Sequence, residues 1–464
     1  LTLTTGRPWV ITWYDNAGHE VEQTTFGPKN VRIARITRYN NRGLVSYVSN
    51  RDGKVRNTER LTYDILGRVI NSKTSSGKET TYSYGDRSVS TTTDGRVSTT
   101  YSDAWGNPVK AVDPLGKSVN YEYGSIGKPV RVTTESSTVV MTYDNAGNQT
   151  SVEDSDAGKH SYEYAADGTV LKHTDPKGVV STYTYDNLGR LYKTQIGDYN
   201  IVNTYGTAGV EKLKLTKQTM GENSVEYTHD KLGRIVSAQK NVSGQGAFAF
   251  SYSYDSRNRL QSTIYPGNLS VSHQYDDYGF CIATTAGDKK IYSLEDYEGG
   301  ASATTVFVDS TKIVRDVDSY GYVKSYSLSV GDKELDRMDF TFDKIRDNLL
   351  KRKRKNEWEY NFKYDELDRL VIVSHDKSSP WVRPNVPQDL SIAVIGMAQD
   401  TVMVMTYSPD GNILSKTGVG AYTYDANIRP HAVVGVENSG GVIPTSTLNT
   451  VFNKLDRIQT IEDV

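Results

Sequence analysis

The chain has 464 residues, a formal net charge of −2, 33 Tyr, 39 Gly and one cysteine. The balanced charge provides no field that would favour nucleic acid or an anionic membrane, and the lone Cys281 excludes an internal disulfide and a cysteine-rich metal site. No apolar run approaches the ~18 residues of a membrane span. Apolar residues are scarce and Tyr, Gly, Ser and Thr abundant, so we expect many half-exposed strands rather than one thick core.

From the N-terminus onward, one short pattern returns along the whole chain: an aromatic residue, Asp, two variable residues and Gly. It starts at Tyr14, returns at Tyr63, and is regular from Tyr101 to Tyr185, where the steps between aromatic residues are 22, 20, 21 and 21 residues. The phase loosens after Tyr205 and recovers at residues 229–235. Such regularity indicates a repeat architecture with one supersecondary unit per repeat.

Each copy of the pattern predicts a β-hairpin. At residues 182–191 two Tyr residues stand two places apart, so in a strand they share one face. Asp186 at the first place of a four-residue turn accepts a backbone hydrogen bond, and Gly189 at the fourth place tolerates a positive φ. The chain should therefore reverse here, and Leu191 should begin the returning strand.

A second kind of turn separates the hairpins, with Asp-Pro-x-Gly at residues 113–116 and 175–178. Because Pro presets φ at the second place of such a turn, these are the reversals at the opposite end of each hairpin. Aromatic residues at every second position of 248–254 favour strand over helix. The sequence predicts an all-β chain of tandem hairpins of about 21 residues, with a β-propeller of two repeats per blade as the alternative fold.

We assign the motif residues a structural role in the repeat and no catalytic, metal-binding or cofactor-binding role. The Tyr residues are expected to form aromatic ladders along one face, and the Arg residues to lie near the Asp of an adjacent turn. The motif residues are Tyr63, Asp64, Gly67, Arg68, Tyr143, Asp144, Gly147, Tyr185, Asp186, Gly189, Arg190, Asp230, Gly233, Arg234, Tyr254, Asp255, Tyr364, Asp365, Arg369, Tyr424 and Asp425.

One stretch departs from the repeat. Pro380, Pro384 and Pro387 crowd into a region where the motif spacing doubles. Since Pro removes hydrogen-bond donors from a sheet, residues 378–401 are predicted to be a non-repeat, Pro-rich insert or loop within the repeat segment 1–464.

Four features could carry chemistry, and each has a plainer interpretation. The Gly-Lys-Ser tripeptide at 116–118 belongs to a turn rather than a phosphate loop, and His229 fills a Tyr position rather than a metal site. The motif Asp residues stand one per turn, without the clustering that Ca²⁺ needs. The basic run 351–355 is expected to be a solvated hairpin tip paired with Glu357 and Glu359, with nucleic-acid or membrane contact as the alternative.

The Tyr-Asp-x-x-Gly-Arg pattern at 63–69 and 185–191, together with residues 407–418, resembles the YD repeat of the Rhs family. That family includes bacterial Rhs polymorphic toxins, the C component of insecticidal toxin complexes, and the animal teneurins. The resemblance covers nearly the whole chain. It implies a spiralling single-layer β-shell, here a fragment of a larger hollow cocoon that encloses a toxic domain. The aspartyl protease-like core motif of bacterial members has no match in this sequence.

These observations predict a non-enzymatic scaffold without cofactor, part of a shell that encapsulates a toxin or effector polypeptide before delivery. The resemblance implies that the cargo belongs to the same polypeptide, that a capping or delivery protein is a further partner, and that the protein is secreted or exposed at the cell surface. The first residues carry no signal-peptide pattern. The alternative is an extracellular adhesion or glycan-binding protein that uses exposed aromatic residues such as Trp105 or Trp381.

Overall fold

The computed structural model describes residues 9–299, 302–307, 310–355, 359–375, 402–425, 429–437, 447–452 and 458–463. Within these ranges the chain forms 40 β-strands, the short 3₁₀ helices η1 (Pro28–Asn30) and η2 (Gly209–Glu211), and no α-helix. No helix in this part of the chain has the length and apolar character needed to cross a membrane. The insert predicted at 378–401 lies outside the described residues.

Most strands follow one another with short connections. The first 20 are β1 Ile11–Tyr14, β2 Glu20–Phe26, β3 Arg32–Tyr39, β4 Val45–Asp52, β5 Val55–Tyr63, β6 Val69–Thr74, β7 Glu79–Tyr84, β8 Ser88–Thr93, β9 Arg96–Ser102, β10 Pro108–Val112, β11 Ser118–Tyr123, β12 Pro129–Thr133, β13 Thr138–Tyr143, β14 Gln149–Asp154, β15 Gly158–Tyr164, β16 Val170–Thr174, β17 Val180–Tyr185, β18 Leu191–Ile196, β19 Tyr199–Tyr205 and β20 Leu215–Met220. The rest are β21 Asn223–His229, β22 Ile235–Val242, β23 Gly246–Tyr254, β24 Leu260–Ile264, β25 Ser270–Tyr275, β26 Cys281–Ala286, β27 Lys289–Tyr297, β28 Ser302–Phe307, β29 Thr311–Val317, β30 Val323–Val330, β31 Lys333–Phe342, β32 Leu349–Arg354, β33 Glu359–Tyr364, β34 Leu370–His375, β35 Val402–Tyr407, β36 Ile413–Lys416, β37 Gly420–Asp425, β38 Arg429–Glu437, β39 Thr447–Phe452 and β40 Ile458–Asp463.

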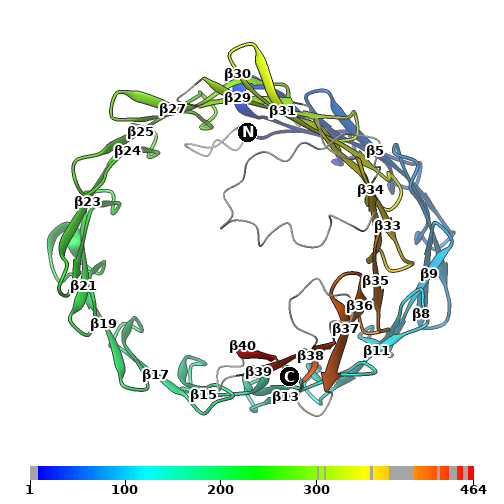
Figure 1. The fold of residues 1–464 in the computed structure, drawn as a ribbon, viewed down its shortest axis with the longest axis horizontal. Coiled ribbons are helices and arrows are strands. Elements are labelled where there is room, and N and C mark those ends of the chain that lie inside the picture. The colour runs from blue at the N-terminus through cyan, green and yellow to red at the C-terminus, as the bar shows by residue number, and fades with distance from the viewer. Residues whose placement is uncertain are drawn as a thin grey trace.

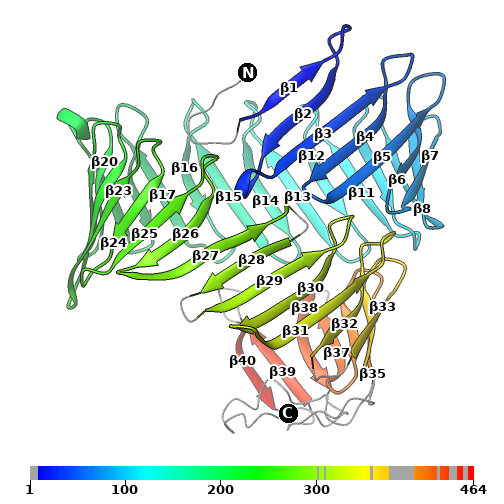
Figure 2. The same ribbon diagram turned by 90° about the horizontal axis from the view of Figure 1, so that it is seen from above.

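All strands belong to one antiparallel meander, in which each named strand of the described chain pairs with its neighbours in sequence. The sheet curves into a ring and continues past its own start, so that the chain makes one full winding and part of a second (Figure 1). Turned by 90°, the β27–β31 region lies alongside the first strands, shifted along the axis (Figure 2). The predicted all-β, single-layer wall of hairpins is confirmed, and the β-propeller alternative is wrong because the sheet is continuous.

The motif places a bulged turn at one end of each hairpin. In the copy that begins at Asp186, the Gly189 N–H donates to the Asp186 carbonyl over 2.9 Å, and Gly189 has φ +74°. The strand register then shifts by one residue beside Tyr185, which is a type I turn followed by a bulge. Asn258 occupies the Gly position of its own turn with φ +64°, a conformation that Asn tolerates better than most residues. We call these turns YD turns, and the turns at the other end of the hairpins opposite turns.

The wall has almost no core. Among the described residues nine apolar side chains are buried, and no large side chain is fully buried. One buried cluster, Val55 with Val317 and the partly buried Val323, joins strands from different windings. A sheet one layer thick must therefore be held by contacts between neighbouring hairpins and between windings, rather than by a hydrophobic interior.

Candidate functional site

The motif tyrosines tie each hairpin to the one before it. The backbone ladder between β16 and β17 covers Lys172, His173 and Thr174 and stops short of the YD turns. Beyond its end, the Tyr185 hydroxyl donates to the carbonyl of Val170, the first residue of β16, over 3.0 Å. The same hydroxyl-to-carbonyl bond is made by thirteen tyrosines: Tyr39, Tyr63, Tyr84, Tyr123, Tyr143, Tyr164, Tyr185, Tyr205, Tyr254, Tyr275, Tyr364, Tyr407 and Tyr424.

The motif arginines fill the space between successive tyrosines. The Arg190 Nε donates to Asp186 Oδ2 in its own turn over 2.7 Å, and its guanidinium lies 4.1 Å from the centre of the Tyr205 ring in the next hairpin. The same arrangement joins further pairs of hairpins, at Arg68 with Tyr84, Arg234 with Tyr254, Arg259 with Tyr275 and Arg369 with Tyr407.

Two expectations about these side chains need correction. The carboxylate that pairs with a motif Arg belongs to its own turn, because the four-residue spacing across the turn brings Arg190 onto Asp186. An arginine can also reach the adjacent turn, as Arg259 does when its Nη1 donates to the Asp276 carbonyl over 3.0 Å. Nor do the motif tyrosines form a continuous ladder: they stand on alternate strands, ~10 Å apart, beyond the 4.5–7 Å of ring stacking. Tyr322, which stands at the Arg position of its turn, stacks on Phe342 with ring centres 5.6 Å apart. We call the Tyr–Arg–Asp set the clamp.

The turn carboxylates that pair with a motif Arg have pKa values below their ordinary value. The Arg190 side chain, followed by backbone N–H groups of Arg190 and Leu188, holds the pKa of Asp186 below its ordinary value. The Arg234 side chain likewise lowers the pKa of Asp230. Each carboxylate thus fixes its turn and its arginine together, which is a structural use of the charge.

A seam joins the two windings. YD turns of the second winding meet opposite turns of the first, and the bonded residues are 244 to 295 positions apart in sequence. Most of the seam ion pairs place the cation on the first winding and the acid on the second, and Arg346 with Asp94 (3.7 Å) has the opposite order. The ion pairs are Lys54 with Glu298 (2.5 Å), Lys78 with Asp347 (3.2 Å) and Arg96 with Asp368 (2.6 Å).

The backbone also takes part in the seam. The Arg56 N–H donates to the Ser319 carbonyl over 2.8 Å. Gly53 lies so close to the second winding that an added Cβ would stand 2.1 Å from the Glu298 carbonyl oxygen. A side chain cannot be placed there without moving one winding away from the other.

Near the end of the second winding the carboxylate belongs to the first winding. His431 donates its backbone N–H to Asp156 Oδ1 over 2.9 Å, and its Nδ1 lies 2.7 Å from Asp156 Oδ2. The seam therefore extends from the contact between Lys29 and Asp276 at one end to this pair at the other. No motif residue of the repeat supplies the first-winding side of these contacts, so sequence reasoning missed the seam.

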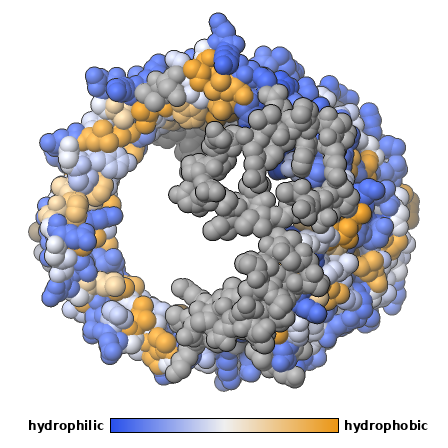
Figure 3. Space-filling model, in the orientation of Figure 1, coloured by the Kyte–Doolittle hydropathy of each residue, from blue (hydrophilic) through white to orange (hydrophobic). Residues whose placement is uncertain are grey.

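The described strands form a ring around a central space. Viewed down the axis, the space-filling surface forms a ring, with hydrophilic residues over most of its rim and scattered apolar ones (Figure 3). A sequence model of the teneurin YD-shell family matches residues 115–427, more than half of the chain.

The chain belongs to the teneurin YD-shell family.

Solved structures agree with this assignment. The YD shell is similar to the TcdB2-TccC3-TEV crystal structure, with a TM-score of 0.75, 13% identity, and coverage of 98% of this chain and 29% of that one. The Photorhabdus luminescens Tc holotoxin pore gives a TM-score of 0.75 at 12% identity, over 98% of this chain and 28% of that one. These likenesses show the fold and confirm the resemblance to Rhs and YD-repeat shells.

One curated protein aligns in sequence. Double-stranded DNA deaminase toxin A of Burkholderia cenocepacia (strain H111) is 23% identical over 258 residues, which are 47% of this chain and 16% of the toxin. The YD shell thus spans less than a third of the length of each of these relatives.

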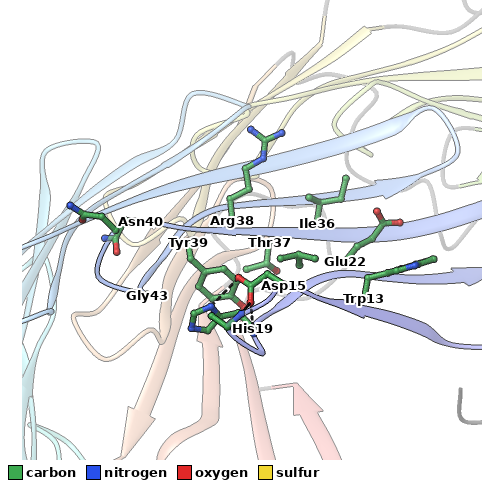
Figure 4. A pocket seen from close by; sticks show the side chains of 13 residues that line it. Trp13, Asp15, His19, Glu22, Ile36, Thr37, Arg38, Tyr39, Asn40 and Gly43 are labelled. Atoms are coloured by element: carbon green, nitrogen blue, oxygen red, sulfur yellow. Dashed lines mark hydrogen bonds and ion pairs between the residues drawn. The ribbon is translucent and has the colours of Figure 1, made fainter.

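A cavity of about 640 Å³ lies between the first two YD turns of the shell (Figure 4). Asp15 caps its own turn through the backbone N–H groups of Ala17 and His19, and its Oδ2 lies 3.0 Å from His19 Nδ1. The Asn40 side chain caps the next turn in the same way. The polar atoms at this cavity hold turns together, so it is a gap between neighbouring hairpins rather than a convergent ligand site.

The other candidate features have local structural roles. Residues 351–354 lie in β32 and not at a hairpin tip. Acids on the flanking strands neutralise the run: Lys351 meets Glu359 (2.9 Å), and Arg354 meets Asp336 (2.8 Å). Glu357 lies outside the described residues. His229 takes the place of a motif Tyr and bonds Glu211 over 2.6 Å. No group of three His, Cys, Asp or Glu side chains that could hold a metal occurs in the described ranges.

Proposed function

We propose that this YD shell is a non-enzymatic wall that encloses an effector polypeptide before its delivery. The observation that carries the proposal is the seam: a single sheet winds past its own start and is fastened to itself over contacts 244 to 295 residues apart. A wall closed on itself in this way surrounds an interior on every side of its axis.

The composition of the wall supports this use. The motif carboxylates with lowered pKa values are engaged within their own turns, as Asp186 and Asp230 are. The described strands form a ring around a central space (Figure 3). The proposed function thus depends on the space that the hairpins enclose rather than on any single side chain.

The relatives suggest the kind of cargo. One is named a deaminase toxin and another a Tc holotoxin pore, and both are several times longer than the part that matches this chain. We infer that the cargo of this shell is a toxin or effector segment of the same polypeptide. Export, and a capping or delivery protein as partner, belong to the same proposal.

Protease protection tests enclosure. The complete polypeptide is treated with proteinase K, and cleavage of any segment outside the wall sequence is followed by mass spectrometry. We expect protection in the wild type and loss of protection in Gly53→Ala, which pushes the seam apart. The matched control is Gly221→Ala, which has the same φ of +57° with nothing within 4 Å of the added Cβ. Equal cleavage in all three proteins contradicts enclosure.

A further inference from the structure

One face of strands β3, β4 and β5 is rich in arginine. Residues that pair across the β3–β4 and β4–β5 ladders lie on the same face of the sheet, and residues two apart in one strand share that face. On these three strands the face carries no Asp or Glu, and at its far end Arg32 pairs with Glu22 of β2. In Figure 4 the Arg38 side chain extends to the side opposite that of Tyr39, its neighbour in β3. The other charged or aromatic residues of this face are Arg38, Tyr47, Arg51, Arg56 and Arg60.

Three of these arginines gather around the Tyr47 side chain. The guanidinium of Arg38 lies 5.4 Å from the centre of the ring, and that of Arg60 lies 5.3 Å from it, so each flanking strand contributes one cation. The Arg56 Nη2 donates to the Tyr47 hydroxyl over 3.3 Å. The Arg56 side chain lowers the pKa of this hydroxyl below its ordinary value, and the charge of Arg38 adds to the effect. We call Tyr47 with Arg38, Arg56 and Arg60 the arginine cluster.

The wall leaves the arginine cluster without a counter-charge. Within the described ranges Arg38, Arg56 and Arg60 pair with no carboxylate. Arg51 stands directly opposite Arg56 in the β4–β5 ladder, where like charges repel each other. The basic run in β32 differs, because acids on both of its flanking strands meet it. An anion bound at the cluster would supply the missing negative charge.

The chemistry of the side chains selects the kind of anion. Each cation is an arginine, whose planar guanidinium donates two parallel hydrogen bonds to an oxyanion. A sulfate or phosphate monoester offers three terminal oxygens, one for each guanidinium at Tyr47, whereas a carboxylate offers two. The arginines of the cluster are exposed, so their N–H groups are available to a ligand.

We propose that the arginine cluster is a binding site for a polyanion that carries sulfate or phosphate monoester groups. One ester group lies among Arg38, Arg56 and Arg60, beside the Tyr47 hydroxyl. Arg51 stands four residues from Tyr47 along β4, ~13 Å away at ~3.3 Å per residue, and receives a second ester group of the same molecule. The inference concerns a ligand of the wall itself, and it stands whether or not the shell encloses a cargo.

Isothermal titration of the complete polypeptide tests the proposal, with sucrose octasulfate and inositol hexakisphosphate as probes. We expect the triple variant Arg38→Gln, Arg56→Gln, Arg60→Gln to weaken binding of the probes at least about tenfold, because it removes the charge-assisted hydrogen bonds. The probe that the wild type binds more tightly shows whether sulfate or phosphate is the preferred ester.

The matched control removes the same number of charges from the neutralised run in β32. The triple variant Lys351→Gln, Arg352→Gln, Arg354→Gln should change the affinity for either probe by less than about twofold, since these side chains lie among acids of their own sheet.

Arginine modification provides a second measurement at the level of single residues. Phenylglyoxal is added with and without the probe, and the modified sites are quantified by mass spectrometry. We expect the bound probe to slow modification of Arg38, Arg56 and Arg60 and to leave Arg131, an exposed arginine of β12, unchanged.

Four results would overturn the inference. One is the absence of binding to both probes, and another is equal weakening by the two triple variants, which would show a response to total charge alone. A glutamate peptide of matched charge that binds as tightly as the probes would assign the face to carboxylates of a protein partner. Resistance of the three arginines to phenylglyoxal without any probe would show that polypeptide covers the face. None of these readouts depends on cargo cleavage, so failure here and failure of the enclosure proposal are distinguishable.

Discussion

The contacts within a winding and the contacts between windings hold the wall in different ways. Within a winding, the clamp joins residues about 15 positions apart, as Tyr185 and Val170 show, and it repeats with the motif. Between windings, partners such as Arg96 and Asp368 are 272 positions apart, and each contact uses a different pair of side chains.

The clamp therefore orders neighbouring hairpins, and the seam closes the ring. The clamp combines a hydroxyl-to-carbonyl bond, an ion pair across a turn and a cation over a ring, so each hairpin can form as soon as its predecessor exists. The seam forms only after a whole winding is complete, and it relies on tight backbone approach at Gly53 and on charges of opposite sign. Changes in the clamp should therefore act locally, and changes in the seam should release two distant regions together.

The largest effect is expected at the closest approach of the windings. Gly53→Ala and Gly221→Ala share the strain of a left-handed residue, ~1–2 kcal/mol, because both glycines have φ +57°. Only Gly53→Ala adds a collision with the Glu298 carbonyl, which we expect to cost roughly a further 1–3 kcal/mol. Urea unfolding of the two variants measures the difference.

Hydrogen exchange locates that effect. In Gly53→Ala, faster exchange is expected both in the β4–β5 turn and in the connection from β27 to β28, whereas Gly221→Ala should change the β20–β21 turn alone. Equal stabilities for the two variants would show that the windings are not in contact at Gly53.

The hairpins and turns within a winding could be predicted from the sequence, and the seam between windings could not. Asp186 and Gly189 are residue types that define a turn by themselves. The recurrence of this pair along the chain predicts the hairpins and the single-layer wall. The sequence also led to two wrong partners, since Arg190 bonds its own Asp186 and successive tyrosines are too far apart to stack. The seam depends on how many residues complete a winding, a property of sheet curvature that no short pattern encodes, so Lys54 and Glu298 could not be paired in advance.

The clamp hydroxyl is expected to have the next largest effect. Tyr185→Phe removes the donor to the Val170 carbonyl and should lower the free energy of unfolding by roughly 0.5–1.5 kcal/mol. Tyr183→Phe is the matched control, because Tyr183 lies partly buried in the same strand and its hydroxyl has no partner within the described ranges. Denaturant unfolding compares the two variants. An equal loss of unfolding free energy in both would show that the Tyr185 hydroxyl bond does not stabilise the wall.

A seam ion pair should have a smaller but longer-ranged effect. Arg96→Gln removes the charge that pairs with Asp368, and because Arg96 is only 17% exposed, we expect a loss of about 1 kcal/mol that shrinks in high salt. Lys73→Gln, which breaks the exposed pair with Glu79 across neighbouring strands, is the control. Hydrogen exchange in Arg96→Gln should rise in both the β8–β9 and the β33–β34 turns, and a rise confined to the first of these would argue against coupling through the seam.

The smallest effect is a pH dependence carried by the turn carboxylates. The Arg190 side chain lowers the pKa of Asp186 below its ordinary 3.8, so the folded state binds this proton less readily than the unfolded state does. The stabilisation is therefore complete above pH 3.8 and is lost as the pH falls through the lowered folded pKa. Asp186→Asn keeps the oxygen that caps the turn and cannot titrate, so the melting temperatures of wild type and variant should converge in acid. Arg190→Gln removes the cause of the shift and should flatten the same pH profile; a wild-type profile that it leaves unchanged would show that the arginine does not hold the turn.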